Sequence, residues 1–81
     1  MNTEPAPLAV GSRIRWSEPL TARRHFFDTD PREGEGVVLA AYHHADGRLQ
    51  GVAVAYHPKH NPAFTAKAYY CAGWTRFEVL A

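Results

Sequence analysis

Gly36 to His57, GVVLAAYHHADGRLQGVAVAYH, is the stretch that decides the fold of this chain. Two runs rich in Val, Ala and Tyr flank the dipeptide Asp46-Gly47. An Asp-Gly pair between two such runs is a strong signal for a tight β-hairpin, because glycine readily adopts the positive φ that these turns require. The sequence therefore predicts two antiparallel strands over 36–57, and the rest of the chain must cover them.

Three shorter segments outside the hairpin also have the character of strands. Arg13 to Trp16 alternates arginine with Ile and Trp, which is the period-2 pattern of a half-buried strand. Lys67 to Trp74 is rich in aromatic and small apolar residues, and Arg76 to Leu80 places Phe and Val on one face. Irregular segments over 17–35 and 57–66, both interrupted by proline, separate these strands. We expect an all-β fold of five strands with a long loop between strands 1 and 2.

Chain length sets the number of domains. The 81 residues make one domain with a thin core. Five short strands in so small a chain favour a closed or nearly closed barrel, because closure removes the unpaired edges of an open sheet. We expect a flexible N-terminal segment over 1–9, which two prolines interrupt, and one barrel domain over 10–81.

Net charge, apolar runs and cysteine content indicate the compartment in which the protein is expected. The net charge is only +1, so no global field drives the protein onto nucleic acid or an acidic membrane. No apolar run approaches the roughly 18 residues that a membrane span needs. Cys71 is the single cysteine, which rules out an intrachain disulfide and fits a reducing compartment. We expect a soluble, cytoplasmic protein with no cofactor and no membrane partner.

Both faces of the predicted hairpin are apolar. With a two-residue turn, Ala45 pairs with Arg48. One face then carries mostly larger residues: Val37, Leu39, Ala41, His43, Gln50, Val52, Val54 and Tyr56. The other face carries mostly small ones: Val38, Ala40, Tyr42, His44, Leu49, Gly51, Ala53 and Ala55. A three-residue turn with a bulge at Gly47 would shift the pairing by one residue, and each strand would still be apolar on both sides.

The small-residue face needs a cover, because a barrel strand can point only one face inward. Either the loop over 17–35 folds over it, with Phe26 and Phe27 as plugs, or a second subunit packs against it. Alanine and glycine let a partner backbone approach closely, and a thin core gains from a partner. We therefore expect a homo-oligomer of undetermined subunit number. Its contact residues would be Ala40, Tyr42, Gly51, Ala53 and Ala55.

The long loop carries a segment that mixes cations with aromatic rings, Arg23-Arg24-His25-Phe26-Phe27. Arginines can hold phosphates while rings stack on bases, as in proteins that bind single strands. Acidic residues in and beside the loop cancel most of this field: Glu18, Asp28, Asp30, Glu33 and Glu35. We interpret the segment as a surface for a protein or small-molecule ligand, with nucleic acid as a disfavoured alternative. Its contact residues would be Arg23, Arg24, Phe26 and Phe27.

Signals for catalysis and for metal binding are weak. The chain has no Gly-x-Ser-x-Gly motif and no phosphate-binding glycine loop. It has five histidines, but His44 and His57 fall at opposite ends of the hairpin, and a zinc site usually adds cysteines to its histidines. We predict no catalytic residue and no metal site. A non-enzymatic binding module is the favoured interpretation, and its biochemical role is left open.

The order of these segments resembles that of an SH3-like barrel. The layout VGSRIRW, GVVLAAY, GVAVAYH and FEVL is similar to plasmid-borne type II dihydrofolate reductase, a family that assembles such barrels as a tetramer around a central pore. This resemblance implies assembly, and it adds a small oligomeric enzyme with a pore site as an alternative function. The matching strand over 68–72, AYYCA, lacks the Val-Gln-Ile-Tyr motif of the family's pore, so no catalytic residue is carried over. The small size also resembles that of products of mobile gene cassettes.

Overall fold

The computed structural model describes residues 8–19 and 30–80, which contain five antiparallel strands and no helix. The strands are β1 (Arg13–Ser17), β2 (Glu33–His43), β3 (Leu49–Tyr56), β4 (Ala66–Cys71) and β5 (Arg76–Val79). They form one sheet in the order β4-β3-β2-β1-β5. The prediction of an all-β fold with five strands is confirmed. The sheet is open, because its edge strands β4 and β5 do not pair with each other.

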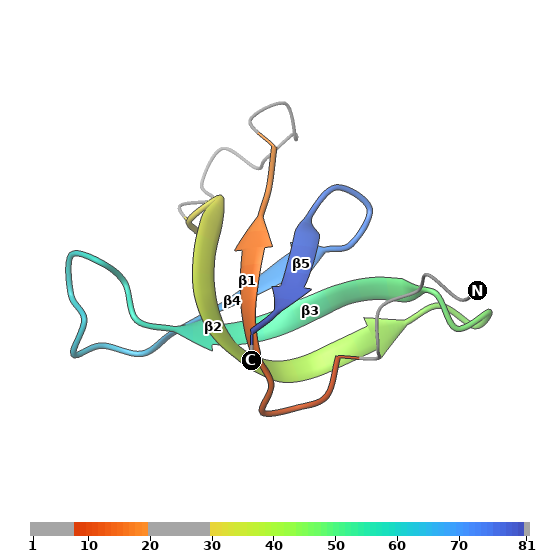
Figure 1. The fold of residues 1–81 in the computed structure, drawn as a ribbon, viewed down its shortest axis with the longest axis horizontal. Helices are drawn as coiled ribbons and strands as arrows, with labels where there is room; N and C mark the ends of the chain where they lie inside the picture. The colour runs from red at the N-terminus through yellow and green to blue at the C-terminus, as the bar shows by residue number, and fades with distance from the viewer. Residues whose placement is uncertain (1–7, 20–29, 81) are drawn as a thin grey trace.

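β2 is the longest strand, with 11 residues, and the two halves of the sheet share it. It pairs with β1 over 33–37 and with β3 over 37–43. Figure 1 shows that β2 curves strongly between these two parts, so that β1 and β5 lie in front of β3 and β4. Gly36 lies in the curved part, where a Cβ would collide with the carbonyl oxygen of Ala55. The bend therefore depends on a glycine that lets the backbones approach closely.

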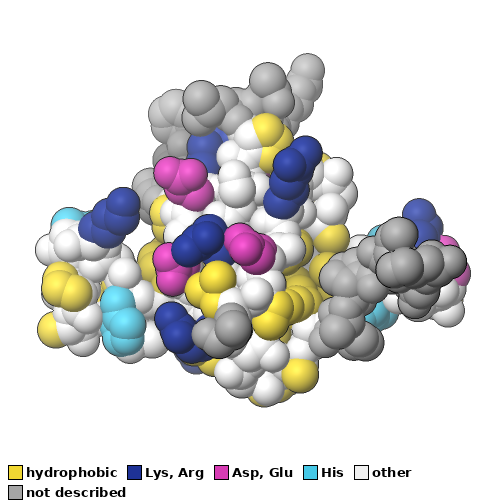
Figure 2. Space-filling view, in the orientation of Figure 1, with side chains coloured by type: hydrophobic (Ala, Val, Ile, Leu, Met, Phe, Trp, Pro, Cys, Tyr) yellow, Lys and Arg dark blue, Asp and Glu magenta, His cyan; other side chains and the backbone are white. Residues whose placement is uncertain are grey.

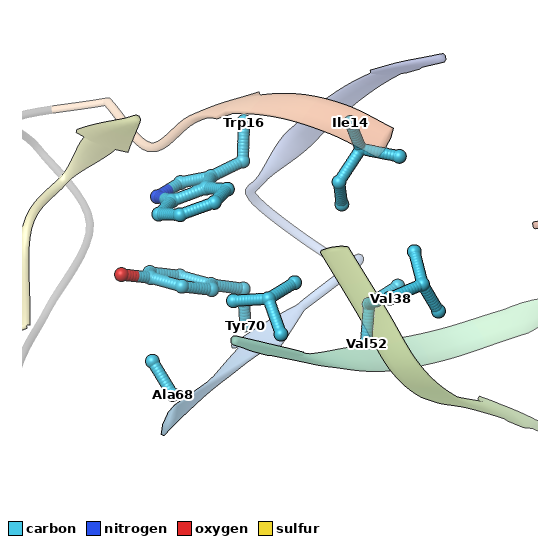
Figure 3. Close-up of a cluster of buried hydrophobic side chains, with 7 residues drawn as sticks. Ile14, Trp16, Val38, Val52, Ala68 and Tyr70 are labelled. Atoms are coloured by element: carbon cyan, nitrogen blue, oxygen red, sulfur yellow. The ribbon is translucent and has the colours of Figure 1, made fainter. Parts of the chain in front are cut away.

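The core lies between the two halves of the bent sheet (Figure 3). Its buried members are Ile14, Trp16, Val38, Val52, Val54, Ala68 and Tyr70. The ring of Trp16 from β1 faces the ring of Tyr70 from β4, with centroids 5.0 Å apart. Burying a large apolar side chain contributes about 1.5–3 kcal/mol, so this small set supplies much of the driving force for folding. The alternation of Ile14 and Trp16 on β1 is as predicted.

The hairpin turn has three residues and not two. The amide of His44 donates to the carbonyl oxygen of Arg48 over 2.8 Å, and the amide of Gly47 donates to His44 over 2.9 Å. Gly47 has a φ of +90°, which is the conformation of the bulge residue in such a loop. The expected pairing of Ala45 with Arg48 is therefore wrong, and the bulged alternative describes the turn.

Two irregularities along β2 and β3 reset the pairing beyond the turn. The first lies between Tyr42 and His43, and it restores the register of the two-residue turn from Tyr42 back to Ala40. The second lies between Val38 and Ala40, where Leu39 is left without a cross-strand partner. Each irregularity moves the residues beyond it to the opposite face of the sheet.

The irregularity at Leu39 reverses the faces expected for the first half of β2. Val38 was expected on the small-residue face, but its side chain is fully buried in the core. Val37 and Leu39 were expected in the core, yet each is 39% exposed. Leu49, also expected on the small-residue face, packs against the core. The period-2 pattern could not choose between the faces, since both are apolar.

Some expectations concern residues beyond those that the structure describes. Most of the N-terminal segment predicted over 1–9 falls on residues 1–7, outside the described part of the chain. Within residues 8–19 and 30–80, no helix is long and apolar enough to cross a membrane.

Candidate functional site

The outer surface of the bent sheet is charged over β1 and β5, where Figure 2 shows basic and acidic side chains side by side. Arg15 of β1 lies between Glu35 of β2 and Glu78 of β5, with N–O distances of 3.3 and 3.4 Å. All three side chains are at least half exposed. Such surface pairs contribute at most about 1 kcal/mol each. This part of the surface is well solvated and needs no cover.

The outer surface over β3, β4 and the part of β2 that pairs with β3 is apolar instead. Cross-strand pairing arranges its residues in three rows: Tyr42, Gly51 and Cys71; Ala40, Ala53 and Tyr69; Val37, Ala55 and Lys67. We call these three rows the apolar face, and Lys67 is its single charged member. The five residues expected at a subunit contact all lie on it: Ala40, Tyr42, Gly51, Ala53 and Ala55. Apolar surface that is contiguous and uncovered marks candidate interaction sites.

The rings of two tyrosines protrude from the apolar face. The ring of Tyr69 lies over Gly51, where a Cβ would overlap the ring, and Gly51 is buried as a result. The ring of Tyr42 packs against Tyr69 with centroids 5.9 Å apart, and both side chains are 49% exposed. Burial of the Tyr69 phenol raises its pKa, and the neighbouring Cys71 and Tyr42 raise it further. The two rings form a ridge beside a floor of alanines.

A hollow of about 270 Å³ lies at the other end of the apolar face. Val37 and Ala55, which pair with each other, line it together with Arg13 of β1 and Thr65 of the loop after β3. The apolar face therefore has a ridge at one end and a depression at the other. A surface of this shape can interlock with a complementary one.

A larger groove of about 800 Å³ lies where the ends of β1 and β2 meet the loop after β3. Half-buried residues line its floor: Pro31, Gly34, Tyr56 and Pro58. Exposed and mostly charged residues form its rim: Arg15, Ser17, Glu33, Glu35, His57, Lys59 and His60. We call this feature the polar-rim groove. An apolar floor with convergent polar groups is the usual composition of a ligand site.

His57 is held in place at the rim of this groove. Its Nδ1 lies 3.0 Å from the carbonyl oxygen of Phe64. A carbonyl oxygen can only accept, so Nδ1 carries the proton, and Nε2 of the neutral ring is an acceptor. Among residues 8–19 and 30–80, no cluster of three or more His, Cys, Asp or Glu residues is arranged to hold a metal ion. His57 therefore acts in this groove through hydrogen bonding.

The ends of the long loop between β1 and β2 are joined by several contacts. The amide of Glu18 donates to the carbonyl oxygen of Arg32 over 2.6 Å, and the Arg32 guanidinium lies 3.1 Å from the Glu18 carboxylate. Arg32 also donates to the carbonyl oxygen of Pro19 over 2.8 Å. The ligand surface predicted within this loop lies outside the described residues: Arg23, Arg24, Phe26 and Phe27.

Sequence reasoning found the apolar face but missed the polar-rim groove. His57 was weighed against a metal site and rejected as a ligand, and Glu33 was counted only as part of the loop's acidic balance. Three segments far apart in the sequence meet at the groove, and no local pattern joins them. The run His57-Pro58-Lys59-His60, which has no acidic member, was the one usable signal for a basic wall.

The apolar face and the polar-rim groove could also be interpreted from similar proteins. We compared the chain with models of protein families, with curated proteins and with solved structures. None of the three comparisons gave a significant match.

Proposed function

We propose that this protein is a non-enzymatic interaction module that self-associates through the apolar face of β2, β3 and β4. One contrast carries the proposal. The outer surface over β1 and β5 is charged, whereas the apolar face has one lysine and two half-exposed tyrosines. Tyrosine is enriched at protein interfaces because it has an apolar ring and a polar tip.

The small residues of the apolar face favour a second copy of the chain as the partner. Ala40, Ala53 and Ala55 let another backbone approach closely, and the Tyr42–Tyr69 ridge can pack against the alanines of a copy related by twofold symmetry. A stable contact buries about 800 Å² on each partner. The whole chain has 6247 Å² of accessible surface, so such a contact would cover about an eighth of it.

We further propose that the bent sheet is an SH3-like barrel. The strand order β4-β3-β2-β1-β5 and the curved β2 that both halves share support this assignment. The Trp16–Tyr70 contact supports it too, because it brings strands from the two halves together. A cytoplasmic location is part of the same proposal, and the single free cysteine, Cys71, supports it.

The decisive experiment measures mass in solution. Light scattering of the unmutated protein should give a multiple of 9.1 kDa, and Ala53→Glu should give the mass of one chain, because it places a carboxylate at the centre of the contact. Gln50→Glu is the matched control, since it adds the same charge to β3 at an exposed position outside the three rows. This control should keep the mass of the unmutated protein.

A second variant tests the same contact in case Ala53→Glu does not fold. If Ala53→Glu loses the cooperative unfolding transition, Tyr42→Lys tests the same contact from an already exposed position. A mass of one chain for the unmutated protein at every concentration measured would overturn the proposal. The alternatives of nucleic-acid binding and of a pore enzyme stay predictions from the sequence.

A further inference from the structure

One wall of the polar-rim groove is negatively charged. Glu33 and Glu35 of β2 line it, together with Arg15 of β1. Arg15 already contacts two carboxylates, those of Glu35 and Glu78. The residues of this wall that line the groove comprise two carboxylates and one guanidinium, so the wall keeps an excess of negative charge. An ammonium group that reached Glu33 would meet a carboxylate that Arg15 does not contact in the described structure.

The opposite wall has the opposite sign. It consists of the loop residues His57, Lys59 and His60, and no carboxylate lies among the residues 57–60. The exposed ammonium of Lys59 provides a full positive charge at neutral pH. The imidazole of His60 can donate a hydrogen bond to an anion, whereas the neutral His57 ring donates its Nδ1 proton to Phe64 and offers Nε2 as an acceptor. The hydrogen bond to Phe64 limits the rotation of the His57 ring.

The floor between the walls is apolar and well held. Pro31 is held there because its carbonyl oxygen accepts hydrogen bonds from Trp16 over 3.3 Å and from Tyr70 over 2.6 Å. The ring of Tyr56 packs edge-on against Trp16, with centroids 5.7 Å apart. Pro58 has little conformational freedom of its own. A floor that is ordered before the ligand arrives reduces the entropic cost of binding.

We propose that the polar-rim groove binds a small zwitterion with an apolar ring. The ligand's carboxylate lies on the side of Lys59, its ammonium lies on the side of Glu33, and its ring lies on the floor beside Tyr56. Free aromatic amino acids and short peptides with free termini share this chemistry. The groove's volume of about 800 Å³ falls within the range of small-molecule sites, so it can hold either.

This proposal goes beyond self-association. None of the five residues assigned to the subunit contact lines the groove. Because the rim charges are exposed, each ion pair with the ligand adds only a modest gain in affinity. For a ligand the size of tryptophan, typical efficiency per atom gives a dissociation constant of about 1 mM. Charge selectivity, and not tight binding, is therefore the property to measure.

The test is a titration of the whole chain followed by amide chemical shifts in NMR spectra. The probes are L-tryptophan, N-acetyl-L-tryptophan, which lacks the ammonium, and L-tryptophanamide, which lacks the carboxylate. L-tryptophan should bind about threefold to fivefold more tightly than either blocked compound. The shifts should centre on residues 33–35 and 56–60. A fourth probe, the dipeptide Trp-Gly with free termini, should bind more tightly than L-tryptophan if peptides are the source, and more weakly if free amino acids are.

Two variants test which wall of the groove binds the ammonium of the ligand and which binds its carboxylate. Glu33→Gln should remove the preference for L-tryptophan over the N-acetyl compound, and Lys59→Gln should remove the preference over the amide. Arg48→Gln, which neutralises an exposed cation of the hairpin turn outside both the groove and the apolar face, should leave both preferences unchanged. Equal affinities for L-tryptophan and both blocked compounds, or shifts centred away from the groove, would overturn the proposal.

Discussion

Trp16 and Tyr70 donate hydrogen bonds to the same acceptor, the carbonyl oxygen of Pro31, over 3.3 and 2.6 Å. Their rings come from opposite halves of the bent sheet and pack with centroids 5.0 Å apart. One backbone oxygen thus satisfies the polar atoms of both large buried aromatic residues. The end of the long loop is therefore part of the core, although it lies outside every strand.

Replacing Tyr70 by phenylalanine should lower the free energy of unfolding by about 0.5–1.5 kcal/mol, because the hydrogen bond to Pro31 is lost while the ring stays. Urea denaturation followed by tryptophan fluorescence measures this change. Tyr42→Phe is the control, since the Tyr42 side chain is half exposed, and it should change stability by less than about 0.5 kcal/mol. Equal losses in the two variants would contradict the role given to the Pro31 oxygen.

Replacing glycine by alanine should lower the free energy of unfolding by different amounts at two positions of the same sheet. At Gly36 the new Cβ meets the backbone of Ala55, which cannot move without distorting β3. At Gly51 the three atoms nearest to the new Cβ all belong to the ring of Tyr69, which can rotate into solvent. We expect Gly36→Ala to cost about 1–3 kcal/mol or more, and Gly51→Ala to cost clearly less.

Denaturation midpoints of both variants test this difference. NMR contacts between the rings of Tyr42 and Tyr69 should disappear in Gly51→Ala, because the Tyr69 ring has left its place. If Gly51→Ala were the more damaging change, the Tyr69 ring would have to be more firmly held than its half-exposed side chain indicates.

Thr75 is a buried residue whose hydroxyl has no hydrogen-bond partner among the described residues. Valine has nearly the same shape and leaves no polar atom to desolvate. Thr75→Val should therefore stabilise the protein by about 1 kcal/mol, which corresponds to a rise in Tm of about 4–8 °C. Calorimetry measures the shift. Thr75→Ser keeps the hydroxyl and loses the methyl group, so it should lower Tm.

The Tyr69 phenol should make stability depend on alkaline pH. Burial raises its pKa in the folded protein, whereas the unfolded chain keeps the ordinary value of about 10. Above this value the unfolded chain loses its proton more readily, so stability falls as pH rises from about 10 through the folded pKa. Below pH 10 this residue has no such effect. Unfolding by urea at about pH 9 and about pH 11 should show a smaller loss for Tyr69→Phe than for the unmutated protein.

Local patterns predicted the strands and the turn. The alternation from Arg13 to Trp16 predicts which β1 side chains are buried, and Asp46-Gly47 marks the turn of the β2–β3 hairpin. These features depend on neighbouring residues, so a single sequence contains them. The grouping of Ala40 with Ala53 and of Tyr42 with Gly51 followed from the same reasoning.

Features that depend on distant residues could not be predicted. The irregularity at Leu39 buries Val38 in place of Val37, and nothing in a run of apolar residues marks where the register changes. The position of the Tyr69 ring over Gly51 depends on the pairing of β3 with β4. The polar-rim groove requires the bend of β2, which the period-2 pattern does not encode.

The pairing of β1 with β5 places Ile14 beside Val79, almost at opposite ends of the described chain. Closing so long a loop costs entropy before any contact compensates for it. β2, β3 and β4 follow one another along the chain and need only short connections. Refolding is therefore expected to begin with these three strands and to finish when β1 and β5 dock. Trp16 would then report a late kinetic phase, and the Tyr42–Tyr69 contact would report an early one.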